Sequence, residues 1–450
     1  MGAFLQLFKD LFLISTTGFI VFWFFKDYRK ALIWYLAFYA FISFIGLSRV
    51  IYNENIVIPL MLLVVLSFKV TKLSKTNIFY VIFLIYMLFI TYINGLTIFD
   101  EISRGVYLFV TILVFSNYLF KNADYATKIV FFIWLISLGY AFNSLIYSES
   151  VFSVSNINSE ERNMVLDTGI QGSSASDKGV DLNYFSSGQA IGAMISLMFI
   201  IYRKQLLSIV LIPPYLKPIF SNVAFTVVLY LLFVLEVWLV FRGLSRGALL
   251  VFFAGMLTFA LVMRKQKYVL YGVLILAVAY FIMNKIGIVD LFMERFTKDE
   301  SGTSGRDLIF LGLFKSVYNQ GGVLQIIFGG GNGWPWWKFL SADFWDKGTI
   351  LSSHNQWLSM LVNVGLLGLT LFFIPLYKGI RNSIKHNNPI NNIRIVLFVC
   401  VFAESLSLEP LIFSRYLWFI LAIAATYTPN QRQTTPRINV HKSIFNNYNL

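Results

Sequence analysis

The stretch VAFTVVLYLLFVLEVWLVF RGLSRG ALLVFFAGMLTFALVM covers residues 223–263 and decides the fold. It consists of two apolar runs, of which the first contains one ionisable residue, Glu236, and the second contains none. A helix needs about 20 apolar residues to cross a membrane. The stretch therefore predicts two transmembrane helices joined by a short turn that carries Arg242 and Arg246.

The same pattern recurs along the whole chain of 450 residues, which is 58% hydrophobic and only 13% charged. This composition excludes ordinary water-soluble domains. A span of about 20 residues and a connection of about 15 predict an all-α polytopic membrane protein with about 12–13 transmembrane helices. The other apolar runs are Leu5–Phe25, Ala31–Leu47, Ile56–Phe68, Ile78–Ile98, Gly105–Phe120, Ile129–Tyr147, Tyr184–Tyr202, Tyr268–Ile286, Trp357–Tyr377, Ile393–Leu408 and Leu411–Thr426.

Positive charge indicates how the spans are oriented, because cytoplasmic connections collect lysine and arginine. The net charge of +14 lies mostly on alternate connections, so it indicates topology and not a nucleic-acid partner. The residues that mark the cytoplasmic side are Lys26, Arg29, Lys30, Lys69, Lys72, Lys75, Lys121, Lys128, Arg203, Lys204, Lys217, Arg264, Lys265, Lys267, Lys378, Arg381, Lys385, Arg432, Arg437 and Lys442.

Two long polar segments fall on the opposite, extracytoplasmic side. The first is rich in Ser, Asn and Asp, whereas the second contains apolar stretches that predict helices packed on the membrane domain. The expected order is 1–147 N-terminal spans, 148–183 polar loop, 184–286 spans with a Ser-Arg-Gly motif, 287–355 large extracytoplasmic loop, 356–427 C-terminal spans and 428–450 basic cytoplasmic tail.

Several kinds of chemistry lose support because their residues are absent. The sequence contains no Gly-Lys pair for an ATP-binding phosphate loop and no Asp-x-Asp for a metal-bound sugar nucleotide. The single cysteine, Cys400, excludes a disulfide framework, and two of the three histidines, His386 and His441, fall on predicted cytoplasmic segments. No metal and no cofactor are expected.

The outer side carries Arg242, Arg246, Arg306 and His354, against the usual charge bias. Guanidinium groups can hold a diphosphate through paired hydrogen bonds, and a histidine can accept a proton near neutral pH. These are the parts of a metal-free transferase whose leaving group is a lipid pyrophosphate. The alternatives are arginines that reach lipid phosphates, an Arg306 that pairs with Asp307, and a structural histidine.

Other residues near these groups have two interpretations each. Trp334 and Trp336 follow the glycines of residues 328–337 and either stack on sugars or anchor the chain at the membrane surface. The glycines permit tight turns or a close approach to a ligand. Glu236 and Glu404 lie in predicted spans, where each either supports an arginine or makes a structural hydrogen bond. For Glu404, Arg415 is the nearest candidate partner.

Three motifs together resemble the O-antigen ligase and polymerase superfamily. They are Ser245-Arg246-Gly247-Ala248 at the start of a span, Gly305-Arg306 on the large loop, and His354-Asn355 before Gly365-Leu366-Leu367-Gly368. The resemblance covers about residues 241–377. It implies a GT-C type glycosyltransferase in the bacterial cytoplasmic (inner) membrane that acts on undecaprenyl-pyrophosphate-linked glycans, without metal and with inversion at the anomeric carbon.

The resemblance also assigns roles. Arg246 and Arg306 would bind the donor pyrophosphate, and His354 would orient or deprotonate the acceptor hydroxyl. Arg242 is not a secure position of the family, and its predicted contact with substrate rests only on its proximity to Arg246. Asn355, Trp334 and Trp336 are also predicted to contact substrate, and Glu236 and Glu404 to support the arginines. Membrane lipids, a chain-length regulator and a flippase of the same pathway are the expected partners.

Three functions stay open at this point. A polymerase is favoured over a ligase because Ser352-Ser353 stands where ligases of this superfamily often show a second histidine. The ligase would transfer finished polymer to lipid A-core. A flippase or other transporter is the third alternative, which the lack of an internal repeat disfavours.

Overall fold

The structure, a computed structural model, describes residues 2–44, 76–94, 123–147, 182–206, 223–242, 245–263, 322–331, 355–407 and 416–428, with eight single residues between 280 and 319. Within these residues the chain is helical and forms no strand. The helices are α1 (Gly2–Phe44), α3 (Ile78–Ile93), α5 (Ala123–Tyr147), α8 (Leu182–Leu206), α10 (Val223–Arg242), α11 (Arg246–Met263), α16 (Gln356–Lys385), α17 (Pro389–Ser407) and α19 (Tyr416–Ala424).

The helices coincide with predicted apolar runs, and four regions in the described part of the chain are long and apolar enough to cross a membrane. These regions are Asp124–Phe142, Arg246–Met263, Gln356–Lys385 and Pro389–Ser407, and α3 and most of α10 are shorter apolar helices. This is the architecture of a polytopic helical membrane protein. The predicted spans at 56–68 and 105–120, and most of the one at 268–286, lie outside the described residues, so the expected number of spans is not tested.

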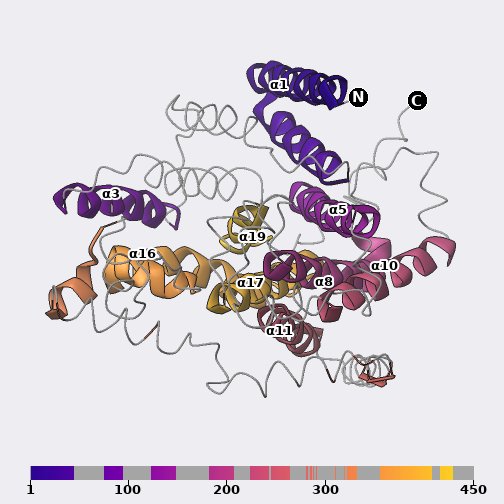
Figure 1. Ribbon diagram of the computed structural model, residues 1–450. Coiled ribbons are helices and arrows are strands. Elements are labelled where there is room, and N and C mark those ends of the chain that lie inside the picture. Colours follow the sequence, from indigo (N-terminus) through magenta and orange to yellow (C-terminus); the bar gives the residue numbers. More distant parts are fainter. Residues whose placement is uncertain are drawn as a thin grey trace, which may run out of the picture.

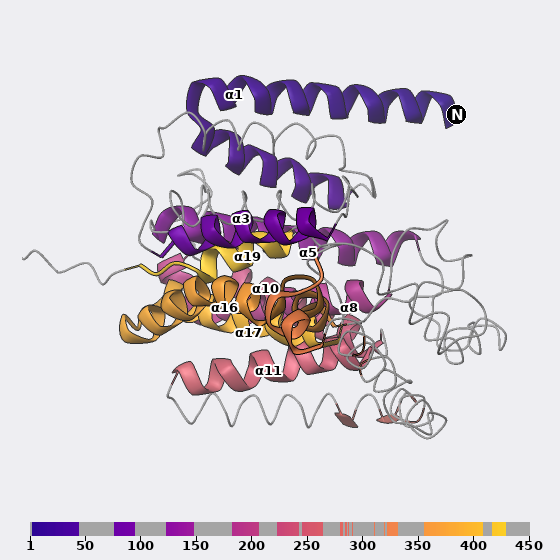
Figure 2. The same ribbon diagram turned by 90° about the vertical axis from the view of Figure 1, so that its left-hand side faces the viewer.

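Helix α1 consists of two legs that meet at Asp27, whose backbone leaves the helical conformation (φ −157°, ψ 97°). The Asp27 carboxylate accepts a hydrogen bond from Arg29 N at 3.1 Å, as expected of a residue that caps the start of a helix. The two legs form a hairpin (Figure 2). Across this hairpin, the Phe19 ring centre lies 5.2 Å from that of Trp34 and 5.8 Å from that of Phe38. The first two predicted spans are therefore separate helices that turn back in their basic connection.

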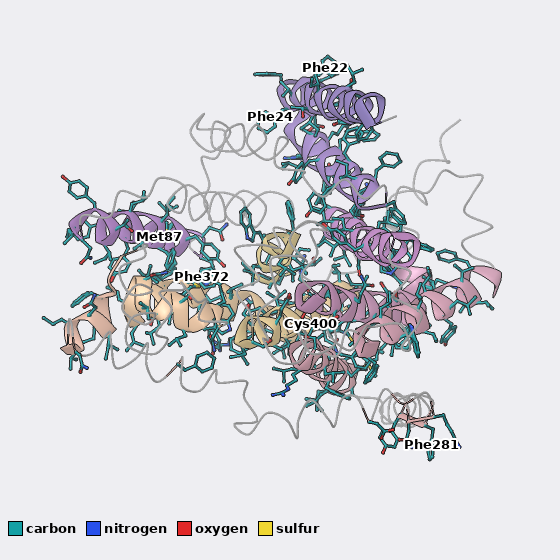
Figure 3. The ribbon with its side chains drawn as sticks, viewed as in Figure 1. Phe22, Phe24, Met87, Phe281, Phe372 and Cys400 are labelled. Carbon is teal, nitrogen blue, oxygen red and sulfur yellow. The ribbon has the colours of Figure 1, made fainter. Side chains whose placement is uncertain are left out.

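Helix α17 occupies the centre of the bundle and packs against α8, α11, α16 and α19 (Figure 1). Its Cys400 lies in the middle of this arrangement (Figure 3) and is fully buried. A Cβ atom at Gly255 of α11 would lie 2.8 Å from the Cys400 sulfur. The missing side chain therefore lets α11 and α17 approach closely, as small residues do at helix contacts in membranes.

The helix ends that the charge pattern assigns to the cytoplasm meet at one end of the bundle. Asn392 Nδ2 at the start of α17 donates to Tyr202 Oη near the end of α8 at 2.8 Å. Ser383 Oγ of α16 donates to Thr426 O after α19 at 3.4 Å. The helices therefore alternate in direction as the charge pattern predicts, while the side of the membrane that each end faces stays a prediction.

Candidate functional site

The opposite end of the bundle brings two of the predicted site residues together at the end of α17. Gly247 of α11 lies so close to Ser407 that a Cβ atom there would collide with the serine hydroxyl. Asn355 Nδ2, at the start of α16, donates to Leu406 O at 3.2 Å. Arg246, which directly precedes Gly247, and Asn355 therefore both lie beside the last turn of α17.

Both motifs begin a helix, and this explains part of their sequence. Ser245 Oγ accepts a hydrogen bond from Ala248 N at 3.3 Å, so Arg246 stands in the first turn of α11. Asn355 has extended backbone (φ −150°, ψ 107°), and its Oδ1 accepts from Leu358 N at 3.0 Å. The Asn355 side chain thus uses its oxygen and its nitrogen on protein atoms, which gives it a structural role that the sequence did not predict.

The remaining predicted site residues differ in what the structure says of them. Arg306, His354, Trp334 and Trp336 lie outside the described residues. Arg242 is the last residue of α10, but its side chain is not among those described. Arg242 and Arg246 do not lie on one continuous helix, because Ser245 is not helical and separates α10 from α11.

Glu236 is fully buried in a hydrogen-bonded network between α5, α8 and α10. Its carboxylate accepts from Ser196 Oγ at 2.5 Å and from Ser137 Oγ at 3.5 Å. Ser196 Oγ accepts in turn from Trp134 Nε1 at 2.7 Å. Of the two interpretations of Glu236, the structure shows the structural hydrogen bond. The sequence had not identified its partners, Ser137 and Ser196.

Replacing Ser196 with alanine is expected to lower the free energy of unfolding by about 1–3 kcal/mol, because a buried carboxylate and a buried indole N–H both lose a partner. Thermal unfolding of the purified protein in detergent measures the effect. Ser186→Ala is the matched control, since Ser186 is buried on the same helix and its hydroxyl forms no hydrogen bond within the described part of the chain. Equal shifts in melting temperature would contradict a specific role of the network.

Glu404 lies one helical turn before Ser407, the last residue of α17, which contacts Gly247 at the start of α11. It shares a face of α17 with Cys400 and Ser407, and these two residues contact Gly255 and Gly247 of α11. Glu404 is fully buried, and in the described part of the chain neither of its carboxylate oxygens has a hydrogen-bond partner. A buried acid in a membrane helix indicates a functional position. Its expected partner Arg415 lies outside the described residues.

The backbone of the glycine-rich stretch at residues 329–331 lies against the backbone of α16. Helix α16 is interrupted at Gly365 (φ 65°, ψ −177°). The carbonyls of Val362 and Asn363 would bond four residues ahead in a regular helix. Here they accept hydrogen bonds from Gly330 N and Gly331 N, both at 2.8 Å. Gly330 and Gly331 thus lie against the backbone of α16, while a close approach of the glycines to a ligand stays a prediction.

Comparison with known protein families gives a match for part of the chain. No curated protein matches the chain. The family model described as O-antigen ligase matches residues 229–373. This region includes most of α10, all of α11 and the first part of α16, and therefore both Arg246 and Asn355. The match supports the resemblance of this chain to the O-antigen ligase and polymerase superfamily that its sequence motifs indicate.

Proposed function

We propose that this protein is a polysaccharide polymerase of the bacterial cytoplasmic membrane. It transfers a growing glycan from undecaprenyl pyrophosphate to a single lipid-linked repeat unit, and the product is an O-antigen, capsule or exopolysaccharide. The observation that carries the proposal is the meeting of Arg246 and Asn355 at the end of α17, inside the region that matches the O-antigen ligase family. His354 directly precedes Asn355 in the sequence.

The proposed reaction needs no metal and inverts the anomeric centre. Arg246 and Arg306 hold the diphosphate, with Arg242 nearby, while His354 takes the proton from the acceptor hydroxyl. The acceptor oxygen forms a bond to the anomeric carbon as the bond from that carbon to the phosphate oxygen breaks, and undecaprenyl pyrophosphate leaves. The arginines stabilise the negative charge that develops on the leaving group. Trp334 and Trp336 stack on sugars, and Glu404 lies beneath the arginine end of α11.

A ligase that transfers finished polymer to lipid A-core is the second candidate, because the family whose model matches residues 229–373 is described as O-antigen ligase. Ser352-Ser353 before His354 favours the polymerase. The two enzymes share the donor and the leaving group, and they differ only in the acceptor. A chain-length regulator and a flippase are the expected partners of the polymerase.

Deletion of the protein followed by gel analysis of surface glycan distinguishes these functions. We expect surface lipopolysaccharide with a single repeat unit in place of a ladder of chain lengths. Unmodified core, with polymer retained on undecaprenyl pyrophosphate, would instead identify the ligase. Accumulation of single units on the cytoplasmic leaflet would identify a flippase. Re-expression of the wild-type chain restores the ladder, and this controls for effects on neighbouring genes.

A further inference from the structure

A short part of the predicted outer segment, residues 322–331, lies against α3 and α16. Residues 322–328 form a helical turn that Figure 1 shows in orange beside the start of α16 and below α3. The hydroxyl of Tyr86 on α3 donates to Phe328 O at 2.5 Å. Together with the bonds from Gly330 and Gly331 to α16, this contact fixes the segment to two apolar helices.

The segment and α16 touch backbone to backbone. A Cβ atom at Gly329 (φ 81°) would lie 2.5 Å from Asn363 O and 2.6 Å from Gly365 N. A Cβ atom at Gly365 would lie 2.5 Å from Gly329 N. Only glycine fits at either position. We call this contact, made by residues 329–331 and 362–365, the glycine clamp.

The depth of the glycine clamp in the membrane can be estimated independently from its position along α3 and along α16. Tyr86 is near the middle of the 16-residue helix α3, about 12 Å from either end at 1.5 Å per residue. Gly365 follows Asn355, the cap of α16, by ten residues, which corresponds to about 15 Å. Since the hydrocarbon core is about 30 Å thick, both estimates place the clamp well inside the apolar section of these helices.

The side chains of the segment suit that depth. Val323, Leu324 and Phe328 are 59%, 68% and 43% exposed, and the sequence has no charged residue from 316 to 337. On the neighbouring helices, Ile85 of α3 and Leu366 of α16 are also exposed. Several exposed apolar side chains on neighbouring elements are unfavourable in water and suit hydrocarbon.

A segment inside the hydrocarbon region must also pair its backbone polar groups, and the described backbone of this segment is largely paired. Non-helical backbone is tolerated inside a membrane where its polar groups are paired within the protein. Gly329 N donates to Gln325 O at 2.7 Å, and Gly330 N and Gly331 N donate to the carbonyls that the interruption of α16 leaves free. The turn therefore presents paired N–H groups and apolar side chains at the same level.

We infer that residues 322–331 are a re-entrant element of the outer segment, inserted into the hydrocarbon region beside α3 and α16. The acyl chains of the bilayer cover Val323, Leu324 and Phe328. The element ends at Gly331, beside Asn363 of α16. The structure describes the chain again from Asn355, which lies about 12 Å from Asn363 along α16. This inference concerns membrane contact and does not depend on the proposed reaction.

Spin labels on introduced cysteines test the inference in reconstituted phospholipid vesicles. The chain has one natural cysteine, so Cys400→Ser provides the background. Leu324→Cys and Val323→Cys carry the test labels on exposed positions. Leu367→Cys reports the depth next to the clamp, and Leu406→Cys reports the outer end, because Leu406 O accepts from Asn355. Thermal unfolding of each labelled protein verifies that it folds.

The measured quantity is the ratio of collision rates with oxygen, which concentrates in hydrocarbon, and with a water-soluble nickel chelate. We expect this ratio at Leu324 and Val323 to equal that at Leu367 and to exceed that at Leu406 severalfold. A nickel collision rate at both test positions as high as at Leu406 would place the segment at the membrane surface. Low collision rates with both reagents would place it against protein. Either result would overturn the inference.

Discussion

Replacing Arg246 with alanine lowers the rate of glycan transfer by about 100- to 1000-fold in our expectation, with little change in the amount of folded protein. The side chain lies in the first turn of α11 and is partly exposed. Its guanidinium is expected to bind the charge that develops on the departing pyrophosphate, so kcat falls more than KM rises. Transfer by purified protein from a lipid-linked donor measures both constants.

Two variants make this result specific. Arg381→Ala removes an exposed arginine from the predicted cytoplasmic end of α16 and is expected to leave transfer unchanged. Arg246→Lys keeps the charge but loses the paired donors of the guanidinium, so its rate should lie between those of the wild type and Arg246→Ala. If Arg246→Ala transferred glycan within a few-fold of the wild-type rate, Arg246 would have no part in the reaction.

The same assay applies to the predicted residues on the large outer segment. Arg306→Ala and His354→Ala are expected to abolish transfer while membrane expression stays near that of the wild type. Arg306 acts on the donor and His354 on the acceptor in the proposed reaction. Transfer retained by either variant would remove that residue from the mechanism.

Replacing Gly365 with alanine is expected to destabilise the protein by roughly 3–5 kcal/mol. The added methyl group meets the backbone of Ile327 and Gly329, which cannot rotate away as a side chain can. Its backbone conformation (φ 65°, ψ −177°) is also one that residues with a Cβ rarely adopt. Thermal unfolding and size-exclusion chromatography in detergent report the loss of folded protein, and Gly329→Ala should behave alike.

Gly322→Ala separates the backbone contact from the conformational strain. Gly322 also has positive φ (61°), but a Cβ atom there would meet no atom within 4 Å. Only the strain is present, so the expected loss is about 1 kcal/mol. If Gly322→Ala were as harmful as Gly365→Ala, the glycine clamp would contribute nothing beyond backbone conformation.

Composition and charge were sufficient to predict the helices. The runs that became α10, α11 and α17 are long and apolar, and a chain in a membrane must satisfy its backbone within each helix. The break at Asp27 also followed from the sequence, because it falls among basic residues between two apolar runs. The order of the motifs predicted a shared side for Arg246 and Asn355, which the end of α17 now brings together.

Contacts between helices could not be predicted in the same way. Gly365 was read as part of an uninterrupted span, since nothing in the neighbouring residues shows that another segment donates to the carbonyls before it. Ser137 and Ser196 are single hydroxyls in apolar runs, and their bonds to Glu236 depend on which helices are neighbours. Such partners depend on tertiary packing, which the periodicity of apolar residues within one helix does not reveal.

The central position of α17 has a consequence for how the protein is made. This helix carries fully buried Asn391, Arg394 and Glu404, which are costly to place alone among lipid chains. Arg394 donates to Asn391 Oδ1 at 2.7 Å, and most of the helix surface is covered by α8, α11, α16 and α19. Three of these four neighbours precede α17 in the chain. We therefore expect α8, α11 and α16 to be in the membrane before α17 is inserted beside them, and α19 to pack against α17 last.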